Sequence, residues 1–149
     1  MNARVIVDTS VLVYTQDADD LTRHNQAIGV LDQLVERGCA VLTSQVLAEY
    51  FVTVTRRFSD RLDADLAAQQ VEDFSDAMPV LDTSLAVILE ALRGVVRYRM
   101  SYYDAQVWAS ARLNGIDTVL SEDFQDGQQI EGVRFVDPFS PAFNAEDRL

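Results

Sequence analysis

The sequence predicts an α/β fold with a mostly parallel sheet of four or five strands. Short runs rich in Val, Ile and Leu alternate along the chain with longer segments in which apolar residues recur at helical spacing. Strands separated by helices form right-handed βαβ units, which place the strands side by side and parallel. Gly38, Pro79 and Gly115 fall where helical segments should end. The 149 residues are expected to form one domain.

The individual elements follow from these patterns in chain order. Residues 4–8 read RVIVD, and such β-branched residues are typical of a buried strand. Helix 22–37 is indicated by apolar residues three and four positions apart, and helix 84–98 by an apolar stripe from Leu85 to Val96. The predicted strands are 4–8, 39–43, 79–82, 117–121 and 133–137, and the predicted helices are 22–37, 44–57, 62–78, 84–98 and 101–114.

Composition limits the classes of protein that the chain can belong to. The formal net charge is −12, and all 12 basic residues are arginine. Such a charge argues against a surface that coats nucleic acid through phosphate contacts alone. Cys39 is the only cysteine, so no disulfide within the chain is expected. We expect a cytoplasmic protein with no membrane association, because no apolar run is long enough to span a bilayer and the N-terminus lacks a signal-peptide pattern.

Four carboxylates stand out by their positions in this fold. Ligands of parallel sheets bind at the carboxyl ends of the strands. Asp8 ends the first strand, and Asp123 closely follows the fourth. Glu49 is the only acid of helix 44–57, and Asp104 lies early in helix 101–114. If the four converge on one cleft, their mutual repulsion requires a cation, and Mg²⁺ or Mn²⁺ suits oxygen ligands.

Each acid also has a purely structural interpretation. Asp104 forms a capping-box pattern with Ser101, Glu49 fits a solvated helix face, and Asp123 fits the start of a surface turn. Asp8 is harder to explain in this way, because a carboxylate buried at a strand end must be paired, hydrogen-bonded or bound to a cation. The absence of lysine argues against phosphotransfer receivers and dehalogenase-type phosphatases. The Gly-rich phosphate-binding motifs are absent as well.

The order of the segments VDTSVLVY, LAEYF, YYDAQVWASA and VLSEDFQDG resembles the PIN domain, and within it the toxin-type ribonucleases of the VapC kind. The resemblance covers residues 4–137, which leaves 138–149 as a polar tail. It implies a three-layer α/β/α sandwich. Asp8, Glu49, Asp104 and Asp123 match the four acids of the family, Ser10 matches its supporting hydroxyl residue, and Asp126 a further acid of some members.

This resemblance implies Mg²⁺- or Mn²⁺-dependent cleavage of RNA, with a small antitoxin protein as partner and a homodimer as a frequent assembly. Helices 22–37 and 44–58 are the expected docking surfaces for an amphipathic segment of the antitoxin. Two alternatives stay open on the sequence alone. One is a catalytically weak or inert PIN-like binding protein, and the other is a housekeeping PIN ribonuclease without an antitoxin.

Binding of RNA requires cations near the acids, and only arginines can supply them. Two arginines lie two helical turns after Glu49, two more are spaced four residues apart, and one precedes Asp104 together with Tyr102 and Tyr103, which could stack on a base. Each of these arginines can also be interpreted as a solvated or ion-paired residue, and for any single one of them that is the preferred interpretation. The candidates are Arg56, Arg57, Arg93, Arg97 and Arg99.

Overall fold

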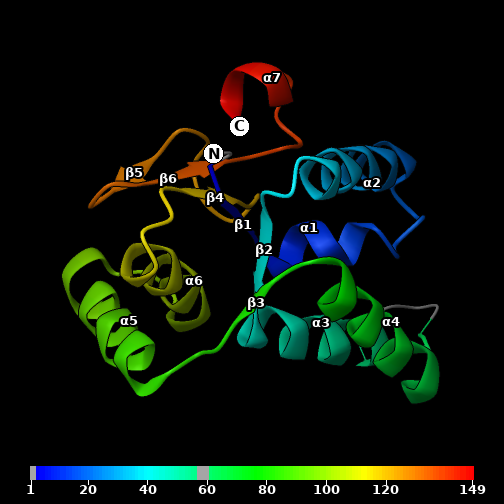
Figure 1. The fold of residues 1–149 in the computed structure, drawn as a ribbon, viewed down its shortest axis with the longest axis horizontal. Helices are drawn as coiled ribbons and strands as arrows, with labels where there is room; N and C mark the ends of the chain where they lie inside the picture. The colour runs from blue at the N-terminus through cyan, green and yellow to red at the C-terminus, as the bar shows by residue number, and fades with distance from the viewer. Residues whose placement is uncertain (1–2, 57–60) are drawn as a thin grey trace.

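The structure, a computed structural model, describes residues 3–56 and 61–149 and contains within them a six-stranded sheet (Figure 1). The strands are β1 (Val5–Val7), β2 (Ala40–Thr43), β3 (Val80–Leu81), β4 (Thr118–Leu120), β5 (Gln129–Ile130) and β6 (Val133–Val136). Their order in the sheet is β3-β2-β1-β4-β6-β5, and only β5 runs antiparallel to its neighbour. The predicted α/β class and mostly parallel sheet are confirmed. The described sheet exceeds the predicted strand count because β5 contains a single apolar residue, Ile130, and so leaves no apolar run in the sequence.

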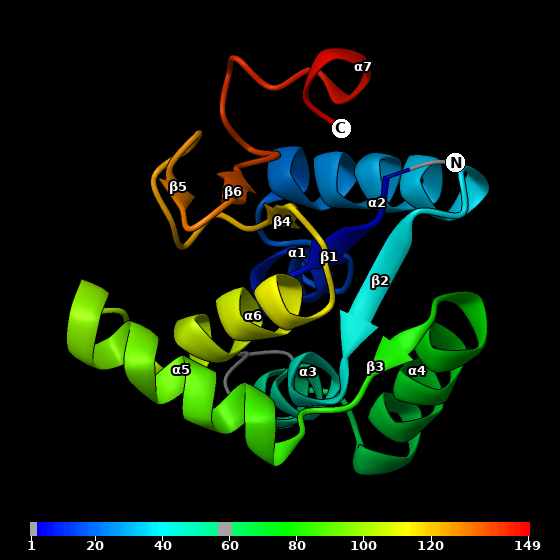
Figure 2. The same cartoon turned by 60° about the vertical axis from the view of Figure 1, so that its left-hand side comes forward.

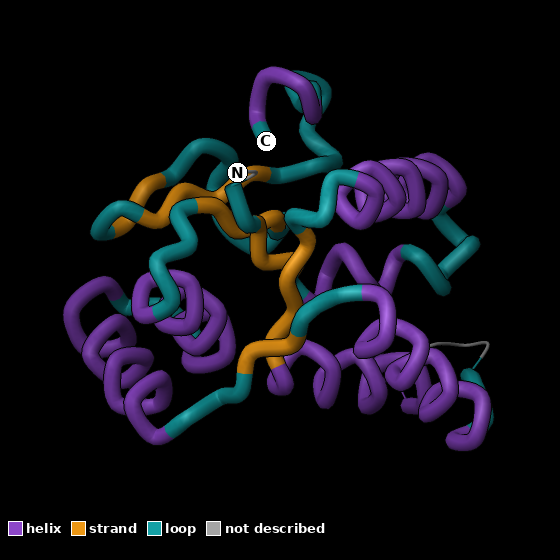
Figure 3. Tube along the Cα trace, viewed as in Figure 1, coloured by secondary structure: helices purple, strands orange, loops and turns teal. Residues whose placement is uncertain are grey.

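Seven helices surround this sheet in the described residues. They are α1 (Thr9–Tyr14), α2 (Leu21–Glu36), α3 (Ser44–Arg56), α4 (Ala64–Ala77), α5 (Leu85–Tyr98), α6 (Tyr102–Leu113) and α7 (Ala145–Arg148). Helices α5 and α6 lie on one side of the sheet, and α1 to α4 lie on the other (Figures 1 and 3). This arrangement confirms the predicted three-layer architecture. None of the described helices has the length and apolar character needed to cross a membrane.

Two short helices escaped the sequence-based prediction. Helix α1 has six residues and α7 has four, so neither is long enough to show a helical period.

Helix α3 starts at Ser44, but the hydroxyl of Thr43 supplies its cap by accepting a hydrogen bond from the Val46 amide at 3.1 Å. The Ser44 hydroxyl instead accepts from the Thr83 amide at 2.9 Å and thereby connects α3 to the loop after β3.

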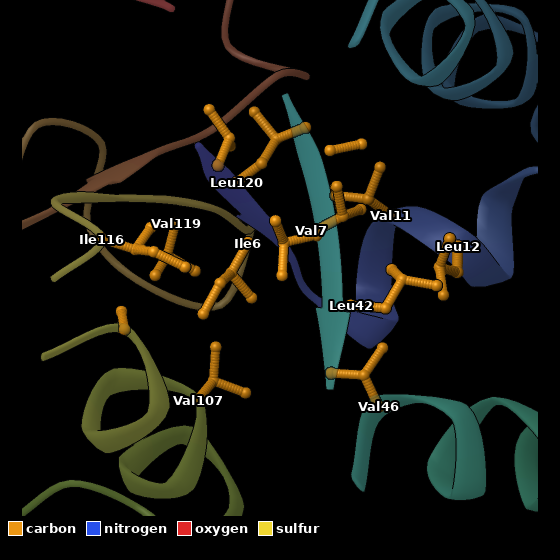
Figure 4. Close-up of a cluster of buried hydrophobic side chains, with 14 of the residues drawn as sticks. Ile6, Val7, Val11, Leu12, Leu42, Val46, Val107, Ile116, Val119 and Leu120 are labelled. Atoms are coloured by element: carbon orange, nitrogen blue, oxygen red, sulfur yellow. The ribbon is translucent and has the colours of Figure 1, made fainter. Parts of the chain in front are cut away.

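The core is centred on β1, whose three residues are all buried. Figure 4 shows Ile6 and Val7 of this strand beside Val119 and Leu120 of β4. Side chains from α1, α3 and α6 cover the two faces of these strands, and Val11, Leu12, Val46 and Val107 are among them (Figure 4). Strand β1 is thus enclosed on both faces. Its carboxyl end lies where helices from both layers begin.

Helix α5 packs in an unexpected orientation. Its apolar stripe faces solvent, with Val96 83% and Leu85 70% exposed, while the buried positions are Val87, Ala91 and Gly94. These smaller residues allow α5 to pack closely on α6, which lies between α5 and the sheet (Figure 2). At Gly94 the packing leaves no room for a side chain, because a Cβ atom there would lie 2.8 Å from Cζ3 of Trp108.

The segment 138–149, predicted as a polar tail, packs against the domain. Pro138 is buried, and its carbonyl accepts a hydrogen bond from Nε2 of Gln26 in α2 at 3.0 Å. The ring of Phe139 meets the ring of Tyr14 edge to face, with 5.0 Å between centroids. Helix α7 then lies above the N-terminal end of the sheet (Figure 1).

The α5–α6 contact predicts opposite effects for two glycine substitutions. Alanine normally stabilises a helix interior by about 1 kcal/mol over glycine. Gly94→Ala should nevertheless destabilise the protein by about 1–3 kcal/mol, because the fully buried Trp108 ring has no room to move away. Gly29→Ala in α2 should be neutral or stabilising, since its Cβ would meet no atom within 4 Å. Urea unfolding of both variants tests this, and a stabilised Gly94→Ala protein would contradict the packing.

Candidate metal centre

Asp8 occupies the most constrained position in the site. It follows β1 directly and is the N-cap of α1, with φ −76° and ψ 159°. Its Oδ1 accepts a hydrogen bond from the Thr9 amide at 2.8 Å, and its Oδ2 accepts from the Ser121 hydroxyl at 2.7 Å. Only 3% of the residue is exposed. The carboxylate is therefore fixed in orientation at the carboxyl edge of the sheet, between β2 and β4.

Two further carboxylates come close to Asp8. One oxygen each from Asp8, Asp104 and Asp123 lies within 4.8 Å of the others, and we call these three residues the acid cluster. Asp104 lies in the first turn of α6. Asp123 follows β4, where its amide donates to the Ser121 hydroxyl at 3.1 Å. Ser121 thus connects two of the three acids.

The surroundings of the acid cluster disfavour negative charge. Burial raises the pKa of Asp8 to about 7. Repulsion from Asp123 and Asp104 adds to this rise, and the hydrogen bonds from Ser121 and Thr9 oppose it. Partial desolvation, followed by repulsion from Asp104 and other acids, raises the pKa of Asp123 to about 6. Within the described part of the chain, no arginine forms an ion pair with any of the three carboxylates.

Glu49 lies at the border of the cluster. Its Oε2 accepts a hydrogen bond from the Thr9 hydroxyl at 3.1 Å, and its Oε1 accepts from Nε2 of Gln45 at 2.6 Å. Its negative charge contributes to the raised pKa of Asp123. The structure therefore brings together three of the four predicted acids and connects the fourth through Thr9, the residue after Asp8.

The donor set of the acid cluster fits a hard divalent cation. Mg²⁺ and Mn²⁺ prefer carboxylate oxygens, and the cluster contains no imidazole or thiolate that would favour zinc or copper. A cation would also remove the repulsion that raises the pKa values of Asp8 and Asp123. Three carboxylates from separate elements could thus hold one such ion.

Three other predicted features take structural places beside the acids. The Ser10 hydroxyl accepts from the Glu122 amide at 3.4 Å, so it braces the loop after β4 and makes no bond to a cluster acid. Asp126 lies outside the acid cluster, and its Oδ1 accepts from the Asp137 amide at 3.0 Å. The Ser101 side chain makes no capping hydrogen bond, so the capping-box interpretation of Asp104 is not supported.

The arginines predicted to bind RNA differ in their environments. Arg93 forms ion pairs with Glu90 and, at 2.8 Å, with Glu131, and its guanidinium lies 5.5 Å from the Trp108 ring centroid. Arg93 therefore connects α5 to Trp108 of α6 and to Glu131, which lies between β5 and β6. Arg97 lies over the Tyr98 ring, whereas Arg56 and Arg99 are exposed. Arg57 lies outside the described residues.

The sequence-based prediction did not include Ser121, Thr9 or Gln45 among the site residues. A signal existed for Ser121, because a polar residue ends the apolar strand TVLS just as Asp8 ends VIVD. Gln45 and Glu49 lie four residues apart, so their hydrogen bond could have been proposed from helical spacing. The bond from Thr9 to Glu49 joins residues 40 positions apart, and the bond from Gln45 to the Tyr103 carbonyl joins residues 58 positions apart. Only the fold reveals these two contacts.

Comparison with known proteins identifies the family of this fold. A family model described as the PIN domain matches residues 5–125. Among solved structures, the toxin VapC20 of Mycobacterium tuberculosis, described as cleaving the sarcin–ricin loop, is 24% identical with a TM-score of 0.61. That match covers 77% of this chain and 86% of the other.

Two further solved structures are also similar. DNA-bound VapBC from Salmonella typhimurium is 15% identical with a TM-score of 0.66, covering 92% of this chain and 99% of that one. FitAcB from Neisseria gonorrhoeae is 15% identical with a TM-score of 0.66, covering 91% and 98%. At these identities the likeness concerns the fold. No curated protein matches the sequence.

The raised pKa of Asp8 predicts how the stability of the metal-free protein depends on pH. The unfolded chain loses the Asp8 proton near the ordinary pKa of 3.8, whereas the folded chain keeps it up to about pH 7. Stability should therefore fall as pH rises from about 4 to 7, and Asp8→Asn should remove most of this loss, while the raised pKa of Asp123 accounts for the rest. At pH 8 in a chelating buffer, Asp8→Asn should be more stable than the wild type by about 2–4 kcal/mol.

Denaturant unfolding at pH 4.5 and pH 8 measures this difference. Asp32→Asn, which changes an exposed carboxylate of α2, is the matched control and should leave the pH dependence as it is. An Asp8→Asn protein that loses stability between these pH values as steeply as the wild type would show that Asp8 is not the group responsible.

Proposed function

Because the chain belongs to the PIN domain family, we propose that it is a Mg²⁺- or Mn²⁺-dependent ribonuclease and the toxin component of a toxin–antitoxin pair. The observation that carries the proposal is the meeting of Asp8, Asp104 and Asp123 within 4.8 Å at the carboxyl edge of the sheet. Such a concentration of carboxylates is costly to a fold, and a function that uses a divalent ion accounts for it.

In this proposal the acid cluster holds the divalent ion, with Glu49 at its border. A bound divalent ion lowers the pKa of water and stabilises negative charge that develops on a phosphoryl group. Ser121 and Thr9 keep the Asp8 carboxylate in one orientation through its two hydrogen bonds. Thr9 and Gln45 fix Glu49 in the same way, so its carboxylate is positioned to orient a water molecule near the scissile phosphate.

The strongly negative chain must still attract RNA. A divalent ion in the acid cluster offsets part of the negative charge where the phosphate would bind, so attraction is needed only locally. Arg56, Arg97 and Arg99 remain the proposed phosphate contacts among the described residues. We leave Arg93 out of this role because its guanidinium is committed to Glu90 and Glu131.

The proposed antitoxin is a small basic protein. Support comes from the similar fold of a toxin–antitoxin complex from Klebsiella pneumoniae, and from the net charge of −12, which a basic partner complements. The proposed docking surfaces are α2 and the described part of α3. A partner arginine that reached the acid cluster would inhibit the enzyme by occupying the place of the metal or the substrate.

A homodimer is also proposed, and the outward stripe of α5 is the surface best suited to it. Four apolar side chains, each close to half exposed or more, follow one another along this helix. Contiguous apolar surface of this kind marks interaction sites. The residues of the stripe are Leu85, Leu89, Leu92 and Val96.

Removal of one cluster carboxylate should abolish RNA cleavage without unfolding the protein. Asp104→Asn keeps the shape of the side chain but removes a negative metal ligand, so cleavage of a cellular RNA mixture should fall at least about 100-fold. Asp8→Asn should have the same effect. The assay titrates Mn²⁺ into each purified protein, and circular dichroism verifies the fold.

Asp32→Asn again serves as the control and should cut RNA as the wild type does. Full activity of a folded Asp104→Asn protein at saturating Mn²⁺ would refute the assignment of the acid cluster. A folded wild type without metal-dependent activity would favour an inert binding protein instead.

The toxin assignment predicts an effect on growth. Expression of the wild type in a bacterial host should arrest growth because cellular RNA is cut, whereas Asp104→Asn should not. Co-expression with the short open reading frame next to its gene should restore growth, and the two proteins should purify together. Unimpaired growth on expression of an active wild type without a partner would point to a housekeeping ribonuclease.

A further inference from the structure

We propose that a groove between α3 and α6 binds one base of the RNA substrate and that Gln45 recognises that base by a hydrogen bond. The inference rests on the proposed ribonuclease function and assigns part of its sequence preference to named residues. Its basis is a buried polar atom without a partner at a groove that adjoins the acid cluster.

The groove runs along one face of α3. Its volume is about 360 Å³, which lies within the range of about 300–1,000 Å³ typical of small-ligand sites. Five of its lining residues belong to α3. Four of them follow the first by three, four, seven and eight positions, so all five share one side of the helix. The start of α6 supplies the sixth lining residue. They are Gln45, Ala48, Glu49, Val52, Thr53 and Tyr103.

Gln45 is 8% exposed, and its amide group has one unsatisfied atom. Its Nε2 donates to Oε1 of Glu49 at 2.6 Å and to the Tyr103 carbonyl at 3.2 Å. Both partners are acceptors, so the NH₂ group must face them and the amide cannot be turned around. Oε1 is consequently left buried without a donor, which costs stability unless a ligand provides one.

A nucleobase can donate a hydrogen bond to this acceptor and at the same time fill the groove. Adenine, cytosine and guanine carry an exocyclic amino group that can donate to Oε1 of Gln45. The ring of Tyr103, which is 58% exposed, offers a stacking face, and Ala48 and Val52 offer apolar walls to a planar ring. Uracil can donate only through N3–H, which lies between two carbonyl oxygens. Donation from N3–H to Oε1 of Gln45 would bring a carbonyl oxygen towards the carboxylate of Glu49, which bonds Nε2 of the same amide at 2.6 Å, so uracil fits less well.

The groove is also correctly placed for a base close to the scissile phosphate. Gln45 bonds one oxygen of Glu49, and the other oxygen of Glu49 bonds Thr9, the neighbour of Asp8. The groove is therefore separated from the acid cluster by a single carboxylate side chain. A base held there would belong to a nucleotide next to the one whose phosphate is cut.

Sequencing of cleavage products from a randomised RNA tests the inference. The wild type, in Mn²⁺, should prefer amino-bearing bases over uracil at one position beside the cut. Gln45→Met keeps the length of the side chain but removes the acceptor, so this preference should fall about threefold to tenfold. Gln69→Met, on the exposed face of α4, is the matched control and should leave the preference unchanged.

A second variant protects the test against misfolding of the first. Val52→Trp fills the groove with a bulky ring, and it should weaken the same preference. The Val52 side chain takes no part in the hydrogen bonds of Gln45 and Glu49, so this change leaves them in place. If Gln45→Met lowers cleavage of all sequences equally, Gln45 only positions Glu49 and the inference is wrong. If selectivity is unchanged and only binding of a protein partner weakens, the groove belongs to that partner.

The test separates this inference from the proposed function. A wild type that cuts RNA with the same base preference as both variants would overturn base recognition by Gln45 and leave the ribonuclease intact. A wild type that cuts no RNA would overturn both.

Discussion

The structure depends on a balance of charge around Asp8. Burial and two neighbouring carboxylates oppose ionisation of this side chain, while hydrogen bonds from Ser121 and Thr9 favour it. The outcome is a pKa of about 7, far from the ordinary value for aspartate. A fold that served only stability would not keep such a group at its centre, because an apolar side chain would be less costly there. The cost is understandable when the carboxylates have a cation to bind.

The topology of the sheet explains how the acids meet. Strand β1 lies between β2 and β4, so the residues that follow β1 and β4 emerge side by side at the carboxyl edge. Asp8 and Asp123 come from these two positions, and Ser121 bonds to both. Asp104 arrives from the other layer on α6, whose Trp108 donates to the Ile130 carbonyl of β5 at 3.1 Å and packs against Gly94 of α5. Core packing and the site are thus parts of one arrangement.

Much of this could be predicted from the sequence, and the failures have physical reasons. Long periodic segments and buried β-branched strands revealed the main elements, and the positions of Asp8 and Asp123 revealed the site edge. Elements as short as α1, α7 and β5 leave no periodic signal. The outward stripe of α5 could not be foreseen, because apolar spacing shows which residues share a face but not where that face points. The partners of Arg93, Ser10 and Asp126 depend on contacts between residues distant in the chain or on loop geometry.

Proton release on metal binding tests the central claim most directly. Asp8 and Asp123 must lose their protons to bind a cation, so Mn²⁺ binding near pH 6 should release protons. Calorimetric titration of the wild type in two buffers of different ionisation enthalpy measures this release. The account predicts a net release of about one proton per Mn²⁺ at pH 6, decreasing towards pH 8 and much reduced in Asp8→Asn. Absence of Mn²⁺ binding, or binding with the same proton release in Asp8→Asn, would contradict it.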